Sequence, residues 1–179
     1  MVRVKQWETQ GALSYLLVEP VSRRSALIDP VAALVGEYMR VIRMRGLHNL
    51  YVLSTRSSVH AEAEWAALPG ERPDAAQMAA GLVLPLGESH IECFVSAAGG
   101  QVAYVADGHL FSGGWLLPFS LRQLNAAQNG DSSCMLPLLN FPDDTILHPG
   151  ETVSGIRISS LAQEKALAVT DRESGGLHG

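Results

Sequence analysis

Short apolar runs separated by turn-forming residues predict a β-rich chain with a few helices. The first three runs predict three strands in a meander: Val2–Val4, Leu13–Val18 and Ala26–Ile28. Apolar residues then recur at helical spacing from Val31 to Ile42, and this stripe predicts a helix. Asp29 is expected to cap that helix and Pro30 to occupy its first turn.

The helix leads into another apolar run, Leu50–Leu53, which predicts a buried strand. We therefore expect the helix to link this strand to Ala26–Ile28 as a β-α-β unit. A second helix is predicted over Val59–Leu68, followed by a loop or weak helix over Pro69–Ala80.

From Gly81 onwards, glycine-containing turns separate further apolar runs. These predict five strands: Leu82–Leu86, Ser89–Val95, Gln101–Ala106, His109–Phe111 and Trp115–Leu117. The remaining pattern predicts a broken helix over Phe119–Leu139, a strand over Thr145–Leu147 and a last helix over Ser159–Val169.

The length and composition are typical of one globular domain. The 179 residues are 47% hydrophobic and 17% charged, which excludes a disordered chain, and a net charge of −5 argues against nucleic acid or a membrane as partner. The sequence has no membrane-spanning apolar stretch, no signal-peptide pattern and only two cysteines. We expect a cytoplasmic protein with one domain over residues 1–170 and a flexible polar tail over 171–179.

An ordered set of segments carries a resemblance to a known family. These segments are Leu13–Leu17, Ala26–Val31, Tyr51–Thr55, Leu110–Leu116, Phe141–Glu151 and Ile158–Lys165. In this order and spacing they resemble the metallo-β-lactamase superfamily, with the branch of glyoxalase II and the persulfide dioxygenases as the nearest match. The resemblance implies an α+β fold, a four-layer αββα sandwich, here in a shortened form.

The resemblance also implies a site where His and Asp side chains hold one or two metal ions, which activate water or dioxygen. The family's first ligand loop, Thr-His-x-His-x-Asp-His, aligns without a gap from Thr55. Its ligand positions then hold Arg56, Ser58, His60 and Ala61. A two-residue shift of this alignment would instead offer His60 and Glu62 as ligands.

The family's other ligand positions have changed as well. The loop Ser96–Gly100 is short and carries no ligand, the bridging Asp falls on Gly114, and the last His falls on Glu151. Only His60 and Glu151 keep a side chain that can coordinate a metal, and both differ from the family's residue type. Loss of ligands in every loop predicts a degenerate site with no catalytic residue and no cofactor.

Five positions are expected to line the vacated pocket: Arg56, Ser58, His60, Gly114 and Glu151. Arg56 would bring a fixed positive charge where metal charge lies in the family. We therefore expect Arg56 or His60 to lie within hydrogen-bond or ion-pair reach of Glu151.

The favoured hypothesis is a pseudoenzyme that serves as a binding or protein-interaction module. Its ligand would be a small anion or thiol drawn by Arg56, or an unknown protein partner. A homodimer is a further option, because Trp65, Trp115 and Phe119 could supply apolar surface.

Two other hypotheses stay open. One is a hydrolase or oxygenase of the glutathione thioester or persulfide type, with zinc or iron at a rearranged mononuclear site. That site would need His60 to converge with others: Glu62, Asp107, His109 or Glu151. The other is a sulfur carrier that uses Cys134, because a thiol at a helix start has a lowered pKa.

Other polar residues have structural interpretations. Asp107-Gly108 predicts a hairpin turn, and His90 and Glu92 are expected on the exposed face of a strand. Cys93 falls on the apolar face of the same strand, which predicts a buried, inert thiol. His148 aligns with an aromatic position of the family, and we expect a structural role for it.

Overall fold

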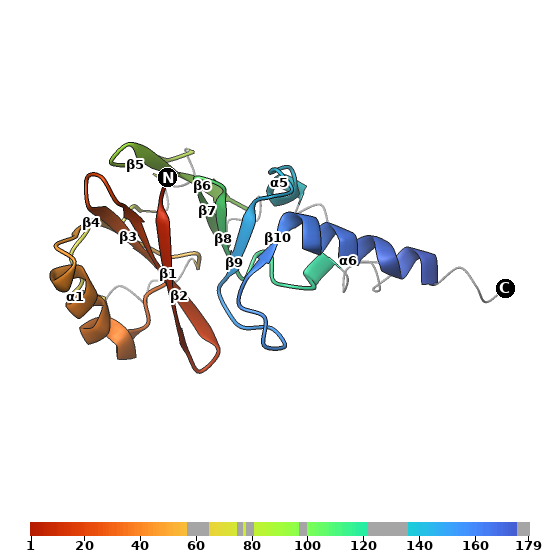
Figure 1. The fold of residues 1–179 in the computed structure, drawn as a ribbon, viewed down its shortest axis with the longest axis horizontal. Helices are drawn as coiled ribbons and strands as arrows, with labels where there is room; N and C mark the ends of the chain where they lie inside the picture. Colours follow the sequence, from red (N-terminus) through yellow and green to blue (C-terminus); the bar gives the residue numbers. More distant parts are fainter. Residues whose placement is uncertain (57–64, 75–76, 78–80, 97–99, 122–135, 175–179) are drawn as a thin grey trace.

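A computed structural model describes residues 1–56, 65–74, 77, 81–96, 100–121 and 136–174. They form two β-sheets that pack face to face, with helices on the outer sides (Figure 1). No helix in these ranges is both long and apolar enough to cross a membrane.

The first sheet has four strands in the order β1-β2-β3-β4. Its strands are β1 (Arg3–Thr9), β2 (Ala12–Glu19), β3 (Arg24–Ile28) and β4 (His48–Leu53). The first three are antiparallel neighbours, whereas β3 and β4 are parallel. A short 3-10 helix η1 (Ala32–Leu34) and helix α1 (Val35–Met44) make the crossover between β3 and β4. The predicted meander and β-α-β unit are therefore confirmed.

The second sheet has six strands in the order β10-β9-β8-β7-β6-β5. Its strands are β5 (Val83–Leu86), β6 (Ser89–Val95), β7 (Val102–Ala106), β8 (His109–Gly113), β9 (Ile146–Pro149) and β10 (Ser159–Ser160). All pairs are antiparallel except β8 with β9. The helices α5 (Leu136–Leu139) and α6 (Leu161–Ser174) belong to the same half of the molecule (Figure 1).

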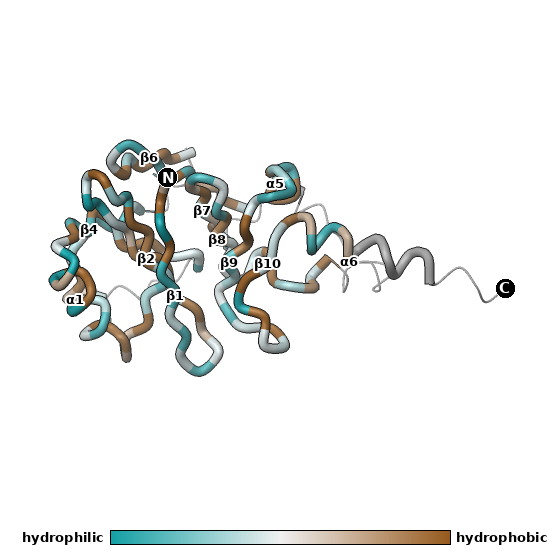
Figure 2. Tube along the Cα trace, in the orientation of Figure 1, coloured by the Kyte–Doolittle hydropathy of each residue, from teal (hydrophilic) through white to brown (hydrophobic). Residues whose placement is uncertain are grey.

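Strand alternation sorts the side chains of β2 between two layers of core. Leu13, Tyr15 and Leu17 face the second sheet, whereas Leu16 and Val18 pack with α1. Hydrophobic positions accordingly run along β2 (Figure 2). A third cluster, which includes Leu138 of α5 and Leu161 of α6, covers the outer face of the second sheet. Three apolar clusters between successive layers give the four-layer αββα arrangement that the resemblance implies.

Strand β6 shows the predicted separation of polar and apolar faces. His90 lies 3.2 Å from Glu92 on the exposed side, while Ile91 and Cys93 are buried. Burial raises the pKa of the Cys93 thiol to about 11. The predicted burial of Cys93 is therefore confirmed, and its low reactivity stays a prediction.

Several predicted elements differ from the structure. Trp115–Leu117 is not a strand, because the chain turns after β8 and packs Trp115 and Leu116 into the outer cluster. Helix α6 begins at Leu161, since the two residues before it pair with β9, and it continues beyond residue 170 to Ser174. Most of the predicted helix Val59–Leu68 and of the segment Phe119–Leu139 lies outside the described residues, as do residues 175–179.

Candidate functional site

Three strand ends meet where the two sheets come together, and we call this place the strand-end junction. Its residues are Thr55 after β4, Gly113 at the end of β8 and Gly150 after β9. A Cβ atom on Gly113 would overlap the Thr55 side chain, and a Cβ on Gly150 would lie 3.0 Å from the Gly113 carbonyl carbon. The Gly150 amide also donates to the Gly113 carbonyl oxygen at 2.8 Å. The three strand ends are therefore in direct contact.

Hydrogen bonds tie the junction to both sheets. The Val102 amide donates to the Thr55 carbonyl at 3.1 Å, and the Tyr104 hydroxyl donates to the Ser54 carbonyl at 2.9 Å. On the other side, the Leu13 amide donates to the Gly150 carbonyl at 2.9 Å. The loops that leave the junction thus start from a rigid base.

Asp29 supports the junction from the end of β3. Its carboxylate accepts hydrogen bonds from the Thr55 amide at 2.8 Å and from the Thr55 hydroxyl at 2.6 Å. Burial raises the pKa of Asp29, while the Thr55 hydrogen bonds and the charge of Arg56 oppose that rise.

The helix cap predicted for Asp29 is wrong. Neither η1, whose N-cap residue is Val31, nor α1 has a side-chain cap. Asp29 lies in the left-handed region with φ +49°, and its amide donates to the Leu53 carbonyl at 2.9 Å. This conformation directs the carboxylate towards the loop after β4 and away from the helix start.

Three of the five predicted pocket residues lie on the rim of the junction. Arg56, Gly114 and Glu151 each follow a junction residue directly in the chain. The backbone of Arg56 pairs with Gln101, and that of Glu151 pairs with Ala12. Ser58 and His60 lie outside the described residues, as do Glu62 and Cys134.

Arg56 and Glu151 do not form the expected ion pair. Both residues are exposed, and no hydrogen bond or ion pair between these two described residues is present. Water solvates both charges, and each backbone is held by a different partner. The Arg56 alternative of that prediction is therefore not realised, whereas the His60 alternative lies outside the described residues.

The described part of the junction does not fit the metal site that the resemblance implies. Gly114 has no side chain that could bridge metal ions, and the Asp29 carboxylate already accepts two hydrogen bonds from Thr55. Among the described rim residues Arg56, Gly114 and Glu151, only Glu151 carries a carboxylate. Across the described ranges, no three His, Cys, Asp or Glu side chains are grouped as metal ligands.

Asp107 and His109 lie at the opposite end of β8 from the junction. Asp107 and Gly108 both have positive φ, +47° and +80°, which is the predicted hairpin turn. His109 pairs with Ile146 at the start of β9, so β8 separates it from Gly113 by roughly 13 Å at about 3.3 Å per residue. A mononuclear site of the alternative hypothesis could therefore use Glu151 or the Asp107 and His109 end of β8, but not both.

The carboxylate of Asp107 stabilises its own end of the sheet. It accepts hydrogen bonds from the Val2 amide at 2.6 Å and the Ser89 hydroxyl at 2.8 Å. Although burial opposes the shift, these hydrogen bonds lower the pKa of Asp107. The residue is accounted for without a ligand.

His148 has the structural role expected for it, together with a partner that the sequence did not indicate. Its ring is buried, stacks on Phe111 at 4.7 Å between centroids, and places Nε2 at 3.0 Å from Nδ1 of His109. Burial and the neighbouring His109 lower the pKa of His148 to about 3, so the ring is neutral at pH 7. A pair separated by 39 residues has no local signal in the sequence.

No protein-family model and no curated protein matches the sequence, but solved structures match its fold over nearly the whole chain. ETHE1 from Myxococcus xanthus has a TM-score of 0.67 at 17% identity, over 99% of this chain and 92% of its own. A metallo-β-lactamase from Staphylococcus aureus subsp. aureus COL gives 0.71 at 16% identity, over 93% of this chain and 62% of its own. The chemotaxis sensor ODP, with a peroxy diiron species, gives 0.58 at 13% identity, over 94% of this chain and 93% of its own. The chain therefore has the metallo-β-lactamase fold, as the resemblance implied, in a short form.

Proposed function

We propose that this chain is a pseudoenzyme, in which the metallo-β-lactamase fold serves as a binding module without metal-dependent catalysis. The observation that carries the proposal is the residue content of the junction rim. Where the resemblance implies metal ligands, the rim carries a guanidinium at Arg56, a bare backbone at Gly114 and one carboxylate at Glu151. A metal site of this fold needs at least three converging ligands.

The rim favours a small anionic or thiol ligand. Arg56 is exposed, and its charge reaches the Asp29 carboxylate behind the junction. A Cβ on Gly114, which also lies on the rim, would meet no atom within 4 Å, so the rim is open at this position. A fixed cation on an open rim suits a carboxylate or thiolate group.

A protein partner or a second copy of the chain is the other class of occupant. Two of the three aromatic residues expected to supply a dimer surface do not, because Trp65 and Trp115 are buried in the core clusters. Phe119 alone of the three keeps partly exposed surface. We therefore place the small-molecule ligand ahead of the homodimer.

The alternative function is a hydrolase or oxygenase with one zinc or iron at a rearranged site, acting on a glutathione thioester or persulfide. The fold likeness to ETHE1 and to the diiron form of ODP favours it. His60 and Glu151 would be its ligands, while Asp107 and His109 lie at the wrong end of β8.

Metal analysis with an activity assay separates the two functions. The protein is purified from cells supplied with zinc, iron and manganese, and then assayed with a glutathione thioester and with glutathione persulfide. We expect much less than one metal ion per chain and no turnover above the uncatalysed rate. Stoichiometric metal together with turnover would overturn the proposal.

Glutathione titration tests the ligand class. Arg56→Gln should weaken glutathione binding about tenfold or more relative to the wild-type protein, because it removes the cation on the rim. Arg43→Gln changes another exposed arginine, on α1, and serves as the matched control. Equal affinities of both variants would contradict a site at Arg56.

A further inference from the structure

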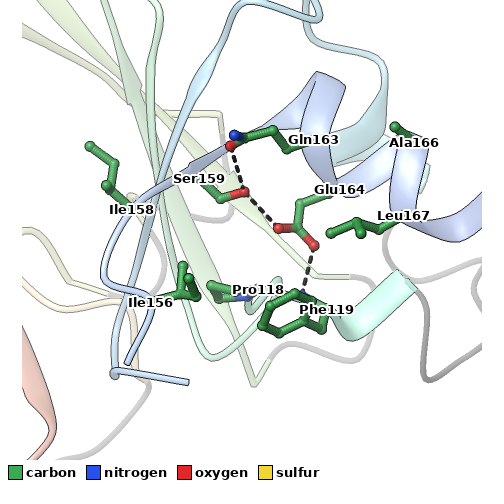
Figure 3. Close-up of a pocket in the computed structure, with 9 residues that line it drawn as sticks. All are labelled: Pro118, Phe119, Ile156, Ile158, Ser159, Gln163, Glu164, Ala166 and Leu167. Atoms are coloured by element: carbon green, nitrogen blue, oxygen red, sulfur yellow. Dashed lines mark hydrogen bonds between the residues drawn. The ribbon is translucent and has the colours of Figure 1, made fainter. Parts of the chain in front are cut away.

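A cavity lies outside the strand-end junction, and its description does not depend on the proposed function. It has a volume of about 400 Å³ and lies between α6, the Pro118-Phe119 turn and the loop before β10 (Figure 3). Its wall is mostly apolar and includes Phe119, Ile156, Ile158 and Leu167. A cavity of this size and lining is typical of small-molecule sites.

A buried carboxylate, Glu164, forms the polar part of this wall. Its side chain on α6 is only 1% exposed. One carboxylate oxygen accepts a hydrogen bond from the Phe119 amide at 2.8 Å, and the other accepts one from the Ser159 hydroxyl at 2.7 Å (Figure 3). Each oxygen keeps capacity for a further donor.

Within the described ranges, no cation pairs with Glu164. The adjacent Lys165 binds Asp143 at 2.6 Å, and Arg157 pairs with Glu8 of β1. Burial of a carboxylate without a counter-charge costs free energy, which two neutral donors offset only in part. Among the residues that the structure describes, none brings a positive charge to this carboxylate.

The Glu164 carboxylate also fixes the aromatic wall. Phe119 has φ +67°, a left-handed conformation that is uncommon for a bulky residue. The hydrogen bond from its amide to Glu164 holds this conformation, with the ring beside the cavity (Figure 3).

The opposite wall presents apolar side chains to solvent at the mouth of the cavity. Ile156 and Ile158 are 37% and 55% exposed and both line the cavity. The residue between them, Arg157, is turned to β1, where it pairs with Glu8 and its carbonyl accepts a hydrogen bond from Gln6. This alternation keeps the cation away from the cavity and leaves the mouth apolar.

We propose that this cavity binds a small amphiphilic amine. The alkyl part lies against Phe119, Ile156 and Ile158, and the ammonium group donates to the Glu164 carboxylate. The ligand supplies the missing positive charge and covers the exposed isoleucines. An anionic amphiphile would bring a like charge to Glu164, and a neutral one would leave the carboxylate without a counter-ion.

Three ligands of equal chain length test the charge preference: octylamine, octanol and octanoate. Calorimetric titration of the full chain at pH 7 should give octylamine at least tenfold tighter binding than octanol, with octanoate weakest. Glu164→Gln should abolish this preference, because it removes the charge. Equal binding of the three ligands, binding of none, or a preference that survives in Glu164→Gln would overturn the proposal.

A second variant tests the proposal without changing Glu164, whose hydrogen bond holds the turn at Phe119. Ile158→Lys places an ammonium group at the exposed mouth, and it should weaken octylamine binding at least tenfold by competing within the chain. Val21→Lys, at a position 74% exposed in the turn between β2 and β3, is the matched control and should leave binding unchanged. A dimer of the wild-type chain that Ile158→Lys dissociates would overturn the proposal, because the cavity mouth would then be an interface.

Discussion

The side chain of Thr55 lies directly against the Cα atom of Gly113, and this contact joins the end of β4 to the end of β8. Thr55 has no freedom to move away, because its amide and hydroxyl both donate to Asp29. Gly113 also has φ +58°, a conformation that L side chains rarely adopt. Space and backbone conformation therefore both require glycine at this position.

Gly113→Ala should destabilise the protein by more than about 3 kcal/mol, because overlap with Thr55 adds to backbone strain. Urea denaturation measures the loss. Gly114→Ala is the matched control, since a Cβ there meets no atom within 4 Å, and its effect should stay within about 0.5 kcal/mol. Similar losses in the two variants would show that the contact with Thr55 is unimportant.

Asp29→Asn should cost about 1–3 kcal/mol of unfolding free energy, because the amide group keeps one acceptor and presents donors to Thr55. Thr55→Val removes one of the donors. If the two residues stabilise each other, the double variant loses less than the sum of the single variants. Asp144→Asn, at an exposed position, is the control and should change stability little. Additive losses would argue against the coupling.

Much of the fold could be predicted because it depends on patterns among residues that are close together in the chain. Alternation in β6 and the Asp107-Gly108 turn involve neighbours in the chain, and both have the expected structure. The apolar stripe of α1 is equally local. The predicted strand Trp115–Leu117 is wrong because an apolar residue after a strand fits either a longer strand or a turn that returns to the core, and tertiary packing decides between them.

The candidate site was only partly predictable. Arg56, Gly114 and Glu151 follow strands whose ends meet, so their convergence follows from the fold. The hydrogen bonds of Asp29 depend on a positive φ that no residue pattern specifies for aspartate. The burial of Glu164 depends on the turn at Phe119, which lies 45 residues earlier in the chain. From sequence alone, a glutamate in a helix is expected to be exposed to solvent.

The buried thiol should be almost unreactive. Burial raises the pKa of Cys93 from 9.0 to about 11, so its thiolate fraction at pH 7.5 is roughly a hundredfold lower than for a free thiol. In a Cys134→Ser variant, iodoacetamide should therefore alkylate Cys93 at least about a hundredfold more slowly than free cysteine.

The same variant in denaturant supplies the control, because unfolding should restore the free-cysteine rate. Cys93→Ala then reports on Cys134 alone, which tests the sulfur-carrier hypothesis. Alkylation of Cys134 no faster than free cysteine would count against that hypothesis, and rapid alkylation of native Cys93 would contradict its burial.

The His109–His148 pair should make stability depend on pH. His148 Nδ1 is buried without a partner in the described part of the chain. The proton of the neutral His148 ring is therefore assigned to Nε2, which donates it to His109 Nδ1. In this tautomer no N–H group of His148 is left unpaired. Because the folded pKa of His148 is about 3, below the ordinary 6.5, the unfolded chain takes up a proton first as the pH falls. The stability that the neutral ring contributes is complete above pH 6.5 and is lost progressively towards pH 3.

His148→Phe keeps an aromatic ring on Phe111 and removes the titrating group. Between pH 7 and 5, the wild-type protein should lose about 2 kcal/mol more unfolding free energy than this variant, as the proton linkage of one group requires. Burial lowers the pKa of His109 in the same direction, so part of the wild-type pH dependence persists in the variant. His90→Phe removes an exposed imidazole and is the matched control. Equal pH slopes in wild type and His148→Phe would mean that His148 is not held neutral by its place in the core.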